Sequence, residues 1–304
     1  MSTGLPHGIS WRGTPSVNDF ETTDRALRIS LALQPDLAEA LGHLADLRWR
    51  QGDVAGTARA LDQTHVSVPN NRHLLRLRAR FFRQTGKLDA ALADIDRVIA
   101  LADPHWDDFI TRGDLLIAHG RLDAADAAYA RAGALNPSAA KVHLHRADAA
   151  VRGNHFDTAS DLLDRARLIR PDLVAIYLNR GNAHFARQAL DRAAVDYRHA
   201  LILKPDHQDS AYNLANTLVE SDAELAALRP FDWAVHGAAP YPRAWVNRGN
   251  TLLYLKQYAA AVASYDRAIA AAPAMAEAHW RKSLALLTAG DYARAWPLYE
   301  WRWR

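Results

Sequence analysis

Several residue types and motifs are missing from this sequence, and each absence excludes a class of function. The chain has no cysteine, which rules out disulfide bonds and thiolate chemistry. It contains no nucleophile elbow, phosphate-binding loop, dinucleotide-binding fingerprint or zinc-protease motif, and its 14 histidines lack the spacing of a metal site. We therefore predict that the chain is not an enzyme and that it binds neither a cofactor nor a metal.

Long apolar runs are absent as well. No stretch of about 18 apolar residues occurs, so no membrane-spanning segment is expected. The segment Met1–Phe20 has neither the basic start nor the apolar core of a secretory signal, which favours a cytoplasmic location. The 37 lysine and arginine residues nearly balance 34 acidic ones, and the resulting net charge of +3 argues against nucleic acid as a partner.

The sequence contains a 34-residue repeat whose register is kept along the chain without insertions or deletions. The eighth place of each repeat is small: Ala45, Ala79, Gly113, Ala147, Gly181, Ala215, Gly249 and Ser283. The twenty-fourth place is large and apolar: Leu61, Ile95, Tyr129, Leu163, Tyr197, Phe231, Tyr265 and Tyr299. The pattern resembles the tetratricopeptide repeat (TPR), in which two helices cross at small residues. The resemblance implies an all-α fold, a right-handed α-solenoid of stacked helix-turn-helix units.

The repeat register divides the chain into three parts. Residues 1–16 are expected to be a disordered tail, residues 17–37 an N-terminal capping helix, and residues 38–304 the solenoid with an incomplete last repeat. The repeats start at Ala38, Arg72, Trp106, Ala140, Val174, Gln208, Pro242 and Ala276. The first helices are expected to end at residues that favour a left-handed backbone, namely Gly52, Gly86, Gly120, Gly153 with Asn154, and Gly290.

The sixth repeat, residues 208–241, departs from the pattern. Its second helix would contain Pro230 and Gly237, and Ala239 replaces the proline that closes most repeats. An internal proline costs a helix about 3 kcal/mol. We therefore expect this helix to be kinked or to start only at Pro230, and the repeat to be the weakest point of the stack.

Asparagines recur at the places that line the groove of a TPR stack. In such a stack the first helices form the concave face, and the sixth and ninth places of three consecutive repeats here hold Asn179, Asn182, Asn213, Asn216, Asn247 and Asn250. Each amide carries a donor and an acceptor, so the rows can hold the backbone of an extended peptide. Alternatively, they only tie adjacent helices together. Tyr212, Arg243 and Tyr254 complete the predicted peptide-binding site.

Charges at the predicted groove positions cancel, which excludes a continuous basic track for single-stranded nucleic acid. One basic cluster remains: Arg76, Arg80 and Arg83 have the spacing of one helix face. This cluster is a candidate secondary patch for an acidic segment of a partner, although an ordinary solvated face explains the same spacing.

The last repeat carries a narrower resemblance. Residues 290–303 read GDYARAWPLYEWRW and resemble the last repeat of bacterial TPR–glycosyltransferase proteins, which are distantly similar to the O-linked N-acetylglucosamine transferases. The resemblance implies that the chain is the acceptor-recognition arm of a larger protein, with a fused or associated glycosyltransferase domain. It also implies that Asn179, Asn213 and Asn247 hold an extended acceptor peptide.

A chaperone-type carboxylate clamp is the rival resemblance. Asn182, Asn213 and Arg243 match three of its five positions, whereas Leu178 and Asn247 stand where its two end cations belong. The predicted function is therefore a protein-interaction module that binds an extended peptide segment. The alternative is a stand-alone scaffold or a co-chaperone-like adaptor that assembles a multiprotein complex.

Overall fold

The computed structural model describes residues 17–34 and 37–303, and every regular element within these ranges is a helix. Consecutive helices pack against each other in pairs, which confirms the predicted all-α solenoid of helix pairs. The tail predicted for residues 1–16 lies outside the described residues. The chain forms two compact parts, an N-terminal part up to Leu135 and a C-terminal part from Asn136 onward.

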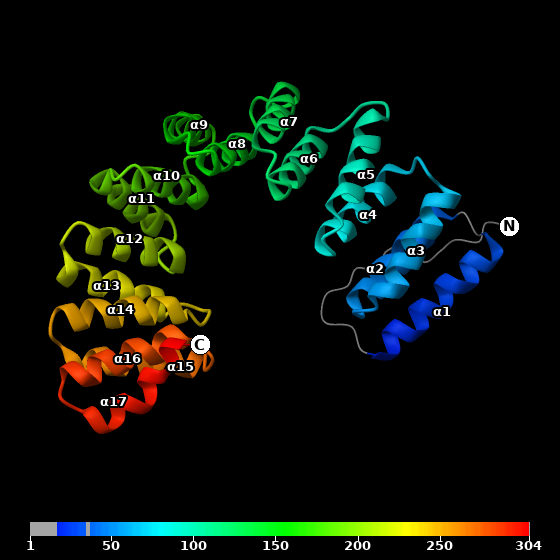
Figure 1. Ribbon diagram of the computed structural model, residues 1–304. Coiled ribbons are helices and arrows are strands. Elements are labelled where there is room, and N and C mark those ends of the chain that lie inside the picture. The colour runs from blue at the N-terminus through cyan, green and yellow to red at the C-terminus, as the bar shows by residue number, and fades with distance from the viewer. Residues whose placement is uncertain (1–16, 35–36, 304) are drawn as a thin grey trace. The chain divides into compact units, whose positions relative to one another are not determined.

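Helices alternate along the chain between the first and the second member of a pair (Figure 1). In the N-terminal part they are α1 (Val17–Leu33), α2 (Ala38–Arg50), α3 (Val54–Ser67), α4 (Arg72–Gln84), α5 (Leu88–Ala100), α6 (Trp106–Ala118) and α7 (Leu122–Leu135). In the C-terminal part they are α8 (Ala140–Arg152), α9 (Phe156–Ile169), α10 (Val174–Ala186), α11 (Leu190–Leu203), α12 (Gln208–Glu220), α13 (Glu224–Val235), α14 (Pro242–Tyr254), α15 (Tyr258–Ala271), α16 (Ala276–Thr288), α17 (Tyr292–Tyr299) and the 3-10 helix η1 (Glu300–Trp303).

The two helices of a pair cross where the eighth place of the repeat meets the twenty-fourth. In three repeats the eighth place is glycine and the side chain above it is a buried tyrosine; these pairs are Gly113 with Tyr129, Gly181 with Tyr197, and Gly249 with Tyr265. A Cβ atom on Gly181 would lie 2.5 Å from Cε1 of Tyr197, well inside van der Waals contact. Where the eighth place is alanine, the twenty-fourth is leucine, isoleucine or phenylalanine. Glycine therefore makes room for the tyrosine ring.

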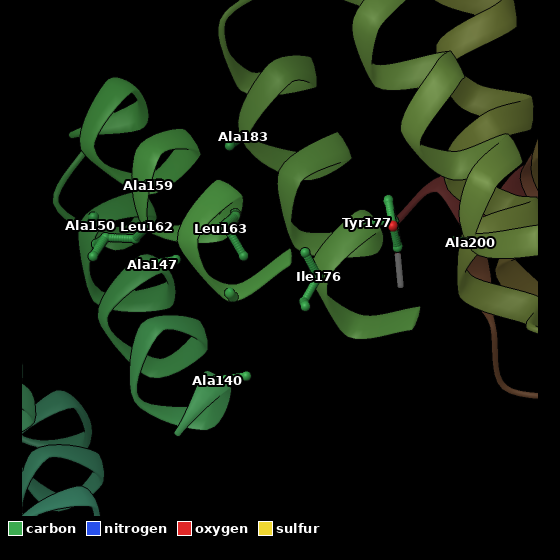
Figure 2. Packing of buried hydrophobic residues seen from close by; sticks show 11 residues of the cluster. Ala140, Ala147, Ala150, Ala159, Leu162, Leu163, Ile176, Tyr177, Ala183 and Ala200 are labelled. Carbon is green, nitrogen blue, oxygen red and sulfur yellow. The ribbon is translucent and has the colours of Figure 1, made fainter. Parts of the chain in front are cut away.

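Small and branched side chains fill the space between successive pairs. In the C-terminal part, one core cluster draws its side chains from α8, α9, α10 and α11 (Figure 2). Its members Ala147, Leu163 and Ile176 are completely buried. Tyr177 lies at the edge of this cluster, where its hydroxyl donates a hydrogen bond to the carbonyl of Pro171 and its ring stacks on His199 with centroids 4.1 Å apart. Each pair is thus held by its neighbours, as expected of a repeat fold.

The turns between the helices of a pair contain a residue in the left-handed region. Gly52, Gly86, Gly120 and Gly290 take this conformation, with φ between 73° and 83°. In the fourth repeat the left-handed residue is Asn154, and Gly153 has an ordinary φ of −83°. The next three repeats use non-glycine residues that the sequence did not reveal, namely Gln188, Asp222 and Lys256.

The second helix of the sixth repeat differs from both expectations for its ends. α13 starts at Glu224, six residues before Pro230, so the expectation of a late start is wrong. It ends at Val235, so Gly237 lies outside the helix. Ala227, Phe231 and Ala234 are completely buried, on one face of α13. Burying a phenylalanine stabilises by about 1.5–3 kcal/mol, which offsets the cost of the internal proline.

Gln208 connects the irregular segment after α13 to the start of α12. Its Nε2 donates hydrogen bonds to the carbonyls of Ala234 and Ala239 at 2.9 and 2.8 Å, and its Oε1 accepts from the backbone N–H of Ala239 at 3.1 Å. A Cβ atom on Gly237 would lie 2.2 Å from the Gln208 side chain, so only glycine at this position avoids a clash with that side chain. The glutamine thus fixes a loop that lacks the usual closing proline.

Replacing Gln208 is expected to destabilise the sixth repeat selectively. Gln208→Ala removes three hydrogen bonds, and at about 1 kcal/mol each, reduced by solvent access, we expect a loss of about 1–2 kcal/mol. Hydrogen exchange should show faster opening of α12 and α13 than of α8 and α9. Gln257→Ala is the control, because Gln257 is exposed and its side chain makes no hydrogen bond among the described residues. Equal exchange in the two variants would contradict a specific role of Gln208.

Candidate peptide-binding site

The asparagine rows lie on first helices that are neighbours in the C-terminal part. α10 contacts α12, and α12 contacts α14, so the three helices line one face side by side. Two hollows open on this face. The smaller, about 220 Å³, is lined by Asn182, Phe185, Tyr197, Asn213 and Asn216. The larger, about 410 Å³, is lined by Asn216, Val219, Glu224, Phe231, Asn247, Asn250, Thr251 and Tyr254.

The amides of neighbouring repeats are hydrogen-bonded to each other. Nδ2 of Asn213 donates to Oδ1 of Asn182 at 2.9 Å, and Nδ2 of Asn247 donates to Oδ1 of Asn216 at 2.8 Å. In both cases the sixth place of one repeat donates to the ninth place of the repeat before it. The amides therefore do tie adjacent first helices together.

These bonds use only half of each amide. Among the described residues, the ninth-place groups Nδ2 of Asn182, Asn216 and Asn250 have no internal hydrogen-bond partner. The same holds for the sixth-place oxygens Oδ1 of Asn213 and Asn247. The helix-to-helix bonds thus leave a row of donors at the ninth place and a row of acceptors at the sixth. This arrangement can address both the C=O and the N–H groups of a bound backbone.

Two of the ninth-place amides are held in position by hydrogen bonds from the buried tyrosines. The hydroxyl of Tyr197 donates to Oδ1 of Asn182, and that of Tyr265 donates to Oδ1 of Asn250, both at 2.8 Å. Burial raises the pKa of both tyrosines well above the ordinary value, which keeps their hydroxyls protonated as donors. The glycine at the eighth place, the tyrosine and the amide form one unit: the space above the glycine admits the tyrosine ring, and the tyrosine hydroxyl orients an amide that lines a hollow.

Three residues of the predicted site line neither hollow. Asn179 makes no asparagine pair, because the ninth place of the preceding repeat is Asp148, which pairs with Arg152. Tyr212 packs its ring against Tyr241 with centroids 5.0 Å apart, and its hydroxyl accepts from Nδ2 of Asn247 at 3.0 Å. Arg243 is exposed at the start of α14. Tyr254, by contrast, lines the larger hollow and is 70% exposed.

The arginine cluster on α4 is largely occupied by carboxylates within the N-terminal part. Arg76 donates two hydrogen bonds to Asp108, at 2.6 and 2.7 Å, and this contact raises the pKa of the guanidinium. Arg80 lies 3.4 Å from Asp46. Arg83 is exposed, and it forms no ion pair within the described residues. Internal pairing thus reduces the charge available for an acidic partner.

A second periodic feature, which the sequence reasoning missed, joins first helices to second helices by ion pairs. The seventh place of most repeats is a cation that binds carboxylates on second helices. Arg78 pairs with Asp94, Arg112 with Asp96, Arg180 with Asp164 and Asp196, Arg248 with Asp232, and Lys282 with Asp266. The sequence signal was the recurrence of a cation at the seventh place, at intervals of 34 residues.

The longest helix within residues 17–34 and 37–303 is α1, with 17 residues. None of the helices in these ranges has both the length and the apolar character needed to cross a lipid bilayer. The same residues contain no group of three or more histidine, aspartate or glutamate side chains placed to hold a metal ion.

Comparisons with known proteins agree with this architecture. A tetratricopeptide repeat model matches residues 43–105, 110–172, 145–207 and 246–300, and thus leaves out the irregular α12–α13 pair. No curated protein sequence matches the chain significantly.

Solved structures share the fold at low sequence identity. A TPR protein from Parabacteroides merdae is 16% identical, with a TM-score of 0.63 over 82% of this chain and 98% of that one. The C-terminal part of a TPR protein from Cytophaga hutchinsonii is 17% identical, with a TM-score of 0.59 over 78% of this chain and 97% of that one. The pilF protein of Pseudomonas aeruginosa is 15% identical, with a TM-score of 0.57 over 68% and 94%. Because the family model matches most of its length, the chain belongs to the tetratricopeptide repeat family.

Proposed function

We propose that this chain is a protein-interaction module that binds an extended peptide segment across α10, α12 and α14. Membership in the TPR family supports protein binding as the class of function. The observation that carries the finer proposal is the pair of hollows that meet at Asn216, with unused donors and acceptors of consecutive amides at their walls.

The spacing of the helices suits an extended backbone. Packed helices lie about 8–10 Å apart, and an extended chain rises about 3.3 Å per residue. Every third residue of a bound segment would therefore meet the next pair of amides. Because such contacts are made to the peptide backbone, the site would bind peptides of different sequence as long as they are extended.

The resemblance of residues 290–303 supports a more specific role. We propose that the bound segment is an acceptor for a fused or associated glycosyltransferase domain, with this chain as the recognition arm and without catalysis of its own. A cytoplasmic location is part of the same proposal. A carboxylate clamp is less well supported, because Nδ2 of Asn213 is engaged by Asn182 and Arg243 lines neither hollow.

Binding of random peptides tests the proposal. The peptides should have about 12 residues, enough to span three helices at about 3.3 Å per residue. We expect Asn213→Ala with Asn247→Ala to weaken binding at least tenfold, about 1.4 kcal/mol. Tyr254→Ala should also weaken it, and this exposed side chain makes no hydrogen bond among the described residues, so the fold is retained.

The proposal departs from the sequence-based expectation in leaving Asn179 out of the site, so Asn179→Ala is the matched control: Asn179 occupies the same place of the repeat but lines neither hollow. It should bind peptides as the unchanged chain does. The proposal fails if no peptide binds, or if all variants, folded by circular dichroism, bind equally well.

A further inference from the structure

The larger hollow contains a carboxylate that its surroundings do not neutralise. Glu224, the first residue of α13, lines the hollow together with the amides of Asn216, Asn247 and Asn250. It is half-buried, and among the described residues it makes no ion pair and no side-chain hydrogen bond. A carboxylate that is partly withdrawn from water without a partner favours a cation from outside.

The repeat register shows that a charge at this place is unusual within the chain. Glu224 occupies the seventeenth place, and the other seven repeats have a large apolar residue there: Val54, Leu88, Leu122, Phe156, Leu190, Tyr258 and Tyr292. In four of these repeats the next residue is aspartate: Asp89, Asp123, Asp157 and Asp191. α13 reverses this order, with glutamate first and Leu225 second.

Helix stability does not explain the reversal. An acidic residue interacts favourably with the helix dipole at either of the first two positions. The reversed order leaves the Leu225 side chain 72% exposed, which loses apolar burial. The reversal places the carboxylate at the seventeenth place, where it lines the hollow, instead of at the eighteenth place.

An aromatic ring completes the surroundings. Tyr254 lines the same hollow and is 70% exposed, so most of its side chain is accessible to a ligand. Carboxylate and aromatic face together select a positively charged group on an apolar stem, which is the chemistry of lysine and arginine. A volume of about 410 Å³ is within the range of sites that hold small ligands, about 300–1,000 Å³.

We propose that the larger hollow is a specificity site that receives a lysine or arginine side chain of the bound segment, with Glu224 as its counter-ion and Tyr254 as its aromatic wall. This inference rests on the proposed peptide binding and adds the side chain that the segment must carry. The amides hold the backbone, and Glu224 fixes the register by selecting a basic residue.

Selection from a random peptide library, followed by sequencing of the bound peptides, tests this site. Peptides selected by the unchanged chain should be enriched in lysine or arginine at one position. In a selected peptide, replacing that residue by norleucine should weaken binding at least tenfold. With Glu224→Gln, both the enrichment and the effect of norleucine should be lost.

Glu220→Gln is the matched control, since it makes the same change of charge four residues earlier, at an exposed carboxylate that does not line the hollow. It should retain the enrichment. If no peptide is selected at all, the proposed function fails and this inference with it. If peptides are selected without a basic position, or if the preference survives Glu224→Gln or is lost equally in Glu220→Gln, only the specificity site is overturned.

Discussion

Gly181→Ala is expected to destabilise the C-terminal part by about 1–3 kcal/mol, although alanine is the better helix former. The added Cβ atom would lie 2.5 Å from the ring of Tyr197, which is 2% exposed and has no room to move. The measurement is the denaturant midpoint of unfolding.

A second substitution should rescue this variant. The fourth repeat combines alanine at the same place with leucine opposite, as Ala147 with Leu163. Tyr197→Leu alone opens a cavity and is expected to cost about 2 kcal/mol or more. In the double variant the two changes compensate, and we expect a coupling energy of at least about 1 kcal/mol. Additive losses would contradict the proposed steric relation between the two places.

The same pair links stability to the groove. Tyr197→Phe keeps the ring but removes the hydroxyl that donates to Asn182, so it should cost only about 1 kcal/mol of stability. We expect Tyr197→Phe to weaken the binding free energy of a peptide by more than it lowers the free energy of unfolding. The reason is that Asn182 would then be oriented only by Asn213.

The helix pairs could be predicted because they depend on steric features that repeat locally. A small residue opposite a bulky one identifies the point where two helices cross. Because eight repeats share one register, the positions of the helices along the sequence are well determined. The ends of α13 could not be predicted in this way. The helix propensity of Pro230 argues for a break, whereas the burial of Phe231 depends on the neighbouring helices.

The places of the groove amides also follow from the register, but their hydrogen bonds do not. Whether Asn213 reaches Asn182 depends on the distance between two helices and on the side-chain torsions. The hydrogen bonds of Gln208 to Ala239 likewise join residues that are 31 positions apart, and no periodic pattern in the sequence predicts them. The register therefore pointed to the five asparagines that line the two hollows, but not to the half of each amide that lacks an internal partner.

Asp196→Ala should have the largest effect of any single substitution considered, about 3 kcal/mol or more. Asp196 is 3% exposed and accepts hydrogen bonds from Nη2 and Nε of Arg180 at 2.5 and 3.0 Å. Removing the carboxylate leaves the Arg180 guanidinium, on a side chain that is only 18% exposed, with Asp164 as its one remaining carboxylate among the described residues. The measurement is again chemical denaturation, with α10 and α11 monitored by hydrogen exchange.

Burial, rather than the ion pair itself, should decide the size of this effect. Arg170 and Asp172 form an equally close two-bond pair, at 2.8 and 2.7 Å, but both side chains are more than half exposed. Asp172→Ala should therefore leave the midpoint nearly unchanged, because exposed ion pairs contribute little.

An apolar replacement of the buried pair gives the complementary result. The first repeat has Leu44 and Ala60 at the places of Arg180 and Asp196, so the fold accommodates apolar residues there. Arg180→Leu together with Asp196→Ala should recover most of the stability that Asp196→Ala loses, because no unpaired charge remains buried. If the double variant is as unstable as the single one, the attraction between the charges, and not the cost of leaving one unpaired, holds these helices together.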